Sequence, residues 1–135
     1  MEDEYSVEAF FSRKPEERSF FDALAQRIFK LFPDVFIKVQ KSQIAFCGSR
    51  SFCWVWLPIR DGIKGRPERY LIVSFGLNRE IVHPRLVGTM QPVPDRWTHH
   101  TILGSTKEID DELMDWIAQA YHWKNEGENE YGKSC

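Results

Sequence analysis

The order of segments constrains the fold of this chain most: a helix, then five strand-like runs, then a second helix. The runs are rich in β-branched and aromatic residues, which favour strands, and they span residues 35–40, 43–47, 51–59, 70–77 and 97–103. Only short breaks separate the first three runs, as is typical of antiparallel hairpins. The order predicts a two-layer α+β fold, an antiparallel sheet of about five strands with N-terminal and C-terminal helices packed on it.

Two segments show the helical spacing of apolar residues, at three- and four-residue steps. The first, 15–32, begins with Pro15 followed by Glu16 and Glu17, which suit the first turn of a helix. The second, 106–123, follows Ser105, and Glu108 lies three residues further on, the spacing of a capping box. Each segment therefore predicts a helix with one buried face.

Length and charge limit the class of protein. A chain of 135 residues suits one domain, and we expect it to span 1–124, followed by a flexible polar tail at 125–135. The formal net charge of -2 gives no field that attracts nucleic acid or an anionic membrane, so nucleic acid is an unlikely partner. No apolar run approaches the ~20 residues of a membrane span, and the chain starts with acidic residues, so we expect a cytoplasmic location and no membrane contact.

Two adjacent histidines, His99 and His100, lie in the last strand-like run. Neighbouring side chains on a strand point to opposite faces, so one histidine faces the layer packed on the sheet and the other faces outward. The sequence does not decide which is which. The outward ring could act as a general base or bind an anion. Neither an HxH nor an HExxH spacing is present, so we predict no metal site and no cofactor.

Several cations lie at strand ends or in the connection 78–95, which contains three prolines and a glycine. If these ends converge, the cations could hold a phosphate or carboxylate beside the histidines, and the long connection could cover them. The simpler interpretation is a scatter of solvated charges. The candidate ligand site comprises Lys41, Arg79, Arg96, Trp97, His99 and His100, with no catalytic residue assigned.

Trp54 and Trp56 are two residues apart in the run 51–59 and therefore share one face of a strand. They form either a partner-binding surface or part of the core, and alternation does not choose because both sets of residues in this run are apolar. Apolar residues on both faces indicate a sheet covered on both sides, by a loop or by a second subunit. A homodimer is therefore possible.

A set of short motifs runs through nearly the whole chain, up to about Trp123. The chain resembles the DUF5655 family of uncharacterised bacterial domains in these motifs: Tyr5-Ser6-Val7-Glu8, Phe52-Cys53-Trp54-Val55-Trp56-Leu57-Pro58, Val73-Ser74-Phe75-Gly76-Leu77, Arg96-Trp97-Thr98-His99-His100 and Ile109-Asp110-Asp111-Glu112. The resemblance implies a two-layer α+β fold like that of YdhG and of type III secretion chaperones. It implies no catalytic residues.

These observations predict a non-enzymatic binding or interaction module whose partner is a small anionic ligand or a protein. The alternative is an enzyme or a nucleotide- or anion-binding domain. It would use His99 or His100 together with three cations, Arg96, Arg79 and Lys41.

Overall fold

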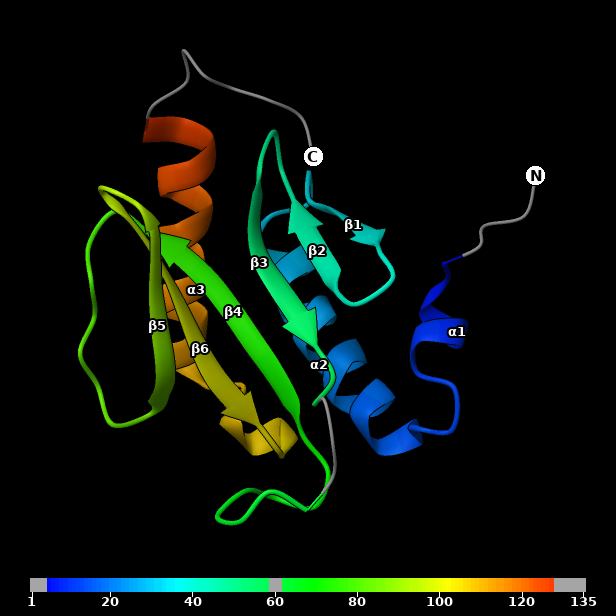
Figure 1. Ribbon diagram of the computed structural model, residues 1–135. Helices are drawn as coiled ribbons and strands as arrows, with labels where there is room; N and C mark the ends of the chain where they lie inside the picture. The colour runs from blue at the N-terminus through cyan, green and yellow to red at the C-terminus, as the bar shows by residue number, and fades with distance from the viewer. Residues whose placement is uncertain (1–4, 59–61, 128–135) are drawn as a thin grey trace.

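The computed structural model describes residues 5–58 and 62–127. Within them the strands form one antiparallel sheet in the order β1-β2-β3-β4-β6-β5 (Figure 1). The strands are β1 Phe36–Val39, β2 Ile44–Cys47, β3 Ser51–Trp56, β4 Leu71–Leu77, β5 Leu86–Val93 and β6 Arg96–Leu103. The predicted α+β class and antiparallel pairing are confirmed, but the sheet has six strands where about five were expected.

The additional strand is β5, which lies inside the segment predicted as an irregular connection. Its register against β6 shifts twice, between Leu86 and Gly88 and between Met90 and Val93. β5 is also an edge strand, and an edge tolerates proline because the amide groups on its outer side need no strand partner. The residues that argued against a central strand are therefore compatible with an edge strand that contains bulges.

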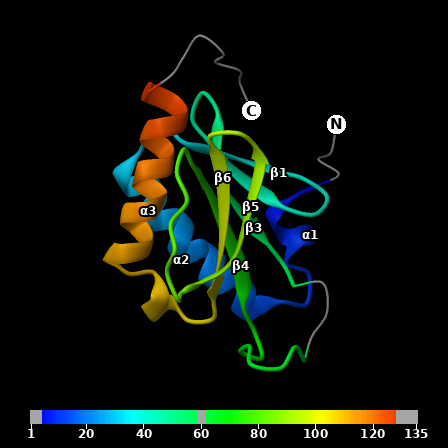
Figure 2. The same cartoon turned by 60° about the vertical axis from the view of Figure 1, so that its left-hand side comes forward.

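Two long helices, α2 Pro15–Leu31 and α3 Asp111–His122, pack on the same face of the sheet (Figures 1 and 2). A short helix, α1 Val7–Phe10, precedes α2; a 3-10 turn, η1 Thr106–Glu108, precedes α3, and a π-helical turn, η2 Trp123–Gly127, follows it. The bounds of α2 were predicted to within one residue. The predicted start of α3 was wrong, because Ser105 caps η1 and the helix begins only at Asp111, where the side chain of Asp110 accepts the Leu113 N–H.

The core lies between the helices and one face of the sheet. On β4 every second residue, from Leu71 to Leu77, is buried in this core. Phe75 stacks on Trp116 of α3 with ring centroids 5.6 Å apart, and Phe32 and Tyr121 join the ends of α2 and α3 with centroids 3.9 Å apart. Burying a large apolar side chain contributes about 1.5–3 kcal/mol, so this layer supplies most of the stability.

The opposite side of the sheet is not covered by α2 or α3, and we call it the open face. The strand register shows which residues belong to this face, because they alternate with the residues that point into the core. They are Trp54 and Trp56 on β3, Ile72, Ser74 and Gly76 on β4, and Thr98, His100 and Ile102 on β6. The face left undecided by the sequence is thereby settled, since Cys53 and Val55 point into the core and the two indoles point away from it.

Candidate functional site

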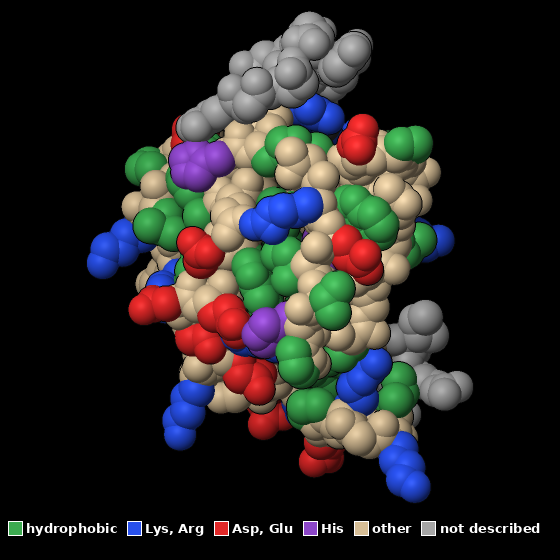
Figure 3. Space-filling model, turned by 90° about the vertical axis from the view of Figure 1, so that its left-hand side faces the viewer, with side chains coloured by type: hydrophobic (Ala, Val, Ile, Leu, Met, Phe, Trp, Pro, Cys, Tyr) green, Lys and Arg blue, Asp and Glu red, His purple; other side chains and the backbone are tan. Residues whose placement is uncertain are grey.

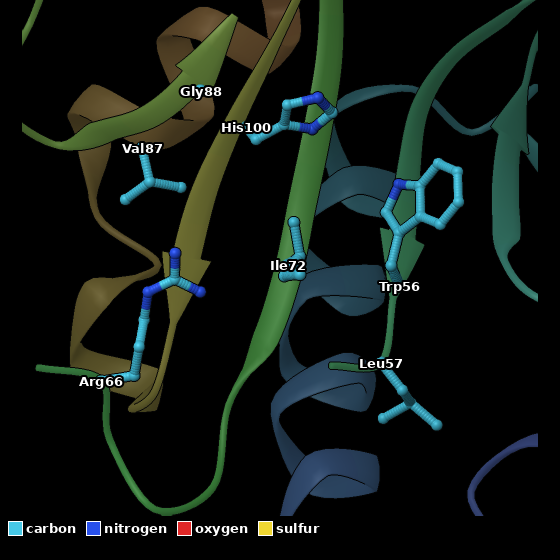
Figure 4. Close-up of a pocket in the computed structure, with 7 residues that line it drawn as sticks. All are labelled: Trp56, Leu57, Arg66, Ile72, Val87, Gly88 and His100. Atoms are coloured by element: carbon cyan, nitrogen blue, oxygen red, sulfur yellow. The ribbon is translucent and has the colours of Figure 1, made fainter. Parts of the chain in front are cut away.

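The open face contains a cavity of about 310 Å³, which we call the sheet cavity (Figure 4). Strands β3, β4 and β6 form its floor, β5 forms one wall, and the segment between β3 and β4 contributes Arg66. Its lining residues are Trp56, Leu57, Arg66, Ile72, Val87, Gly88 and His100. A volume of this size is in the lower range of small-molecule sites.

His100 reaches the cavity from β6, directly opposite Ser74 on β4. The two side chains are hydrogen-bonded, with 2.6 Å between Oγ of Ser74 and Nδ1 of His100. Burial lowers the pKa of His100 below its ordinary value, so the ring is neutral near pH 7. Among the described residues Nε2 has no hydrogen-bond partner, whereas Ser74 is fully buried. Ser74 therefore orients the ring and is not accessible as a nucleophile.

Trp56 contributes a second polar group, its indole N–H. The Nε1 atom is buried and has no hydrogen-bond partner among the described residues. Figure 4 shows this nitrogen on the side of the indole that faces His100. A buried donor without an acceptor costs about 1–3 kcal/mol. Because the atom is shielded from solvent in this geometry, a ligand acceptor would recover that energy only after a rotation of the indole.

Arg66 contributes the only charge in the described lining of the cavity. Its guanidinium lies 5.7 Å from the ring centroid of Tyr70, and Nη1 lies 3.3 Å from the Tyr70 hydroxyl. No ion pair to a carboxylate is formed by Arg66 within the part of the chain that the structure describes. The remaining lining is apolar apart from His100 and Trp56, and the described lining contains no carboxylate. Such a cavity suits an apolar molecule with an anionic or acceptor group.

His99 points to the other side of the sheet, as alternation requires. It is fully buried, its ring stacks on Phe75 with centroids 5.1 Å apart, and its Nε2 accepts the N–H of Ile81 at 2.9 Å. Burial is the largest cause that lowers the pKa of His99. Accepting a backbone N–H requires the neutral ring, so His99 serves to attach the 78–85 segment to the sheet.

The other predicted site residues do not converge on the cavity. Lys41 lies in the β1–β2 turn beside α1, and Arg79 donates to Gln119 of α3. Trp97 is paired with Leu77 and so faces the helix side, while Arg96 begins β6 at the far end of the open face. Of the six candidates, His100 alone is among the residues that line the cavity.

The two tryptophans predicted as a partner surface both lie on the open face. Trp56 lines the cavity, and Trp54 lies next to it along β3. Five other lining residues were not predicted from the sequence, namely Leu57, Arg66, Ile72, Val87 and Gly88. The only signal that pointed toward Arg66 was the basic, glycine-containing character of its segment.

The connection 78–95, which was expected to cover the site, divides in two: its later part forms β5 and contributes Val87 and Gly88 to the cavity wall, whereas its first part packs against α3. Nε2 of His83 lies 3.0 Å from Glu112, and the Arg85 guanidinium lies 2.9 Å from Asp110. The hydroxyl of Thr101 also donates to the backbone oxygen of Arg85. Residues 5–58 and 62–127 hold no group of three His, Cys, Asp or Glu side chains arranged to bind a metal ion.

Fold and cavity together define a small α+β domain with one sheet face covered by helices and one that carries a ligand-sized cavity. The chain belongs to the DUF5655 family, a domain of unknown function, whose family model matches residues 7–124. No curated protein and no solved structure matches the chain. Among the described helices, none combines the length and the apolar character needed to cross a membrane.

The family expected from the motifs is confirmed. The bacterial origin and the likeness to YdhG and to secretion chaperones stay predictions, as does a domain that ends at residue 124. Residues 128–135 of the expected tail lie outside the described residues. Asn125, at the start of that segment, accepts the N–H of Arg50 and donates to the backbone oxygen of Tyr121.

Proposed function

We propose that this domain is a non-enzymatic cytoplasmic binding module that holds a small, largely apolar anion in the sheet cavity. The observation that carries the proposal is the composition of the lining: an apolar cavity whose polar groups are a cation, an unpaired N–H donor and a neutral imidazole. Sites for small molecules commonly combine apolar walls with a few convergent polar groups. Nucleic acid and membranes are less suitable ligands because the net charge is -2.

The polar groups of the cavity favour a ligand that carries a carboxylate or a similar anionic group. A guanidinium can bind a carboxylate through two parallel hydrogen bonds, and the described residues leave Arg66 without a carboxylate partner. If Ser74 donates its hydroxyl hydrogen to Nδ1, the proton of the neutral His100 ring lies on Nε2, which then donates into the cavity. Trp56 supplies a further N–H on the same side.

The enzymatic alternative has weaker support. An acyl-transfer site needs an accessible nucleophile next to its base, and Ser74, the hydroxyl bonded to His100, is fully buried. The alternative also relies on His99 together with Arg79 and Lys41. His99 accepts a backbone N–H on the opposite face of the sheet, and the two cations lie on different elements away from the cavity.

The test is a thermal-shift titration at constant ionic strength with benzoate, indole-3-acetate, neutral benzamide and cationic benzylammonium. The carboxylates are expected to raise the melting temperature by mass action, by the equivalent of about 2.7 kcal/mol at a hundredfold excess over Kd. Benzylammonium should have no effect, because the cavity already holds a cation.

Two variants locate the binding. Gly88→Leu places a side chain beside His100, where a Cβ would lie 3.5 Å from Cδ2, and should abolish the shift by filling the cavity. Arg66→Gln should lower the affinity for the carboxylates more than the affinity for benzamide. Val82→Leu, at a side chain that is 89% exposed, is the matched control. The proposal fails if no probe stabilises the wild type, or if Gly88→Leu responds as the control does.

A second copy of the chain is the other candidate partner. Apolar side chains are exposed along the β5 edge of the sheet and in the segment before it (Figure 3), namely Val82, Val87, Met90 and Val93. An edge strand with exposed apolar residues can pair with another chain. Sedimentation velocity across a range of protein concentrations tests this, and a monomer throughout the range would exclude the homodimer.

A further inference from the structure

The end of the open face away from the cavity contains a lysine in an unusual position. Lys124 belongs to η2, which lies beside the end of β4. Its side chain crosses Gly76, where a Cβ would lie 3.4 Å from Cε of the lysine. The Nζ atom lies 5.7 Å from the ring centroid of Trp54 and 5.5 Å from that of Trp123. Lys124 as a whole is only 6% exposed, and its ammonium group lies close to both indoles.

Within residues 5–58 and 62–127, this ammonium group meets no anionic partner. Among the described residues Lys124 forms neither an ion pair nor a hydrogen bond, and the charges that act on it are those of Arg96 and Arg50, both positive. Burial and then these two cations lower the pKa of Lys124 to about 8. Contacts with two indole faces stabilise a cation by about 0.5–2 kcal/mol each, which offsets only part of the cost of burying a charge.

The position of the lysine is fixed by a second set of contacts. Asn125, the next residue, accepts the N–H of Arg50 at 2.7 Å and the hydroxyl of Ser49 at 2.9 Å. These bonds attach η2 to the β2–β3 turn and bring the Arg50 backbone to the lysine. Arg96 approaches from the start of β6 and is, like Arg50, partly exposed. The cluster is therefore assembled from three separate elements, and its two arginines face solvent.

We propose that Lys124, Arg96 and Arg50 form an oxyanion site on the open face, separate from the sheet cavity, for a phosphate or carboxylate group. The three cations repel one another, and none forms an ion pair with a carboxylate among the described residues. A bound oxyanion neutralises this repulsion, while the indoles of Trp54 and Trp123 exclude water from one side and so strengthen the interaction. The site shares no residue with the cavity lining.

The test is a thermal-shift and calorimetric titration of the whole chain with sodium sulfate, sodium phosphate and sodium acetate, each against sodium chloride of equal ionic strength. Sulfate and phosphate are expected to raise the melting temperature beyond chloride. An equal effect of acetate would show that the site accepts carboxylates as well. No specific effect of any of the three would overturn the proposal and leave Lys124 as a residue that only packs on the sheet.

Lys124→Met removes the charge but keeps an unbranched stem over Gly76, and it should abolish the anion-dependent shift. Arg96→Gln should weaken the shift, and it keeps the proposal testable if the lysine variant does not fold. Lys107→Met, at an exposed lysine on η1, is the control. Arg66→Gln should leave sulfate binding unchanged, which separates this site from the cavity. Retention of the shift in Lys124→Met would refute the assignment.

The pH dependence gives an independent signature. An anion binds the protonated amine, so sulfate affinity should be constant below the pKa of Lys124 and fall as the pH rises through about 8. Sulfate is the appropriate probe because, unlike phosphate, it does not titrate in this range. In Lys124→Met this dependence should disappear. A sulfate affinity that stays constant between neutral and alkaline pH in the wild type would contradict the role of the lysine.

Discussion

Substitution of the buried His99 tests how much this residue contributes to the stability of the fold. In His99→Leu the core keeps a side chain of similar size, but the N–H of Ile81 loses its acceptor and Phe75 loses its stacked ring. An orphaned, partly buried donor costs about 1–3 kcal/mol, and an aromatic pair contributes about 0.5–1.5 kcal/mol beyond its area. The substitution also removes Nδ1 of His99, a buried atom without a hydrogen-bond partner among the described residues, which offsets part of this loss. We therefore expect a net loss of about 1–3 kcal/mol at pH 7.5, a substantial part of the stability of a domain of this size.

The pH dependence of this loss has a definite sign. Burial lowers the pKa of His99 below 6.5, so the unfolded chain takes up the proton at a higher pH than the folded one. The contribution of His99 is complete above pH 6.5 and decreases as the pH falls below it. The difference in stability between the wild type and His99→Leu should therefore shrink between pH 7.5 and 5.5, while His100 is present in both proteins as a common background.

Urea unfolding, followed by tryptophan fluorescence, measures the difference in unfolding free energy. The slope m should be the same in the wild type and the variants. His99→Gln is the matched variant, because it keeps an acceptor but cannot titrate. It should recover part of the stability and show the pH dependence of the leucine variant. The reasoning is refuted if His99→Leu is as stable as the wild type, or if the difference between them is independent of pH.

Two further predictions concern the helix start and a close backbone contact. Asp110→Ala should lower the free energy of unfolding in urea by about 1–2 kcal/mol, because the carboxylate caps α3 through the Leu113 N–H and also binds Arg85. Asp111→Ala, at an exposed carboxylate, should change it by less than about 0.5 kcal/mol. Equal losses in the two variants would disprove the cap. Gly104→Ala should cost about 1–3 kcal/mol because its Cβ would lie 2.8 Å from Cγ of Pro67, whereas Gly88→Ala meets only an ordinary contact; equal melting temperatures of the two variants would contradict this.

The sequence alone determined the element types and most of their boundaries. The helical stripe of 15–32 and the β-branched runs identify α2 and the strands other than β5 because these signals are local, arising from neighbouring residues on one face. The same local geometry places His99 and His100 on opposite faces. The sequence also identifies the family, because the motifs that characterise it are short and contiguous.

Tertiary structure decided what depends on residues far apart in the chain. β5 forms a strand in spite of Pro92 because it is at the edge of the sheet, and neighbouring residues do not encode that position. Both sides of β3 are apolar, so only the helices packed on the sheet determine that Trp54 and Trp56 face away from them. The cavity and the cation cluster join side chains from separate elements, including Arg66 and Lys124. Their proximity follows from strand order and helix packing, which no local pattern of residues specifies.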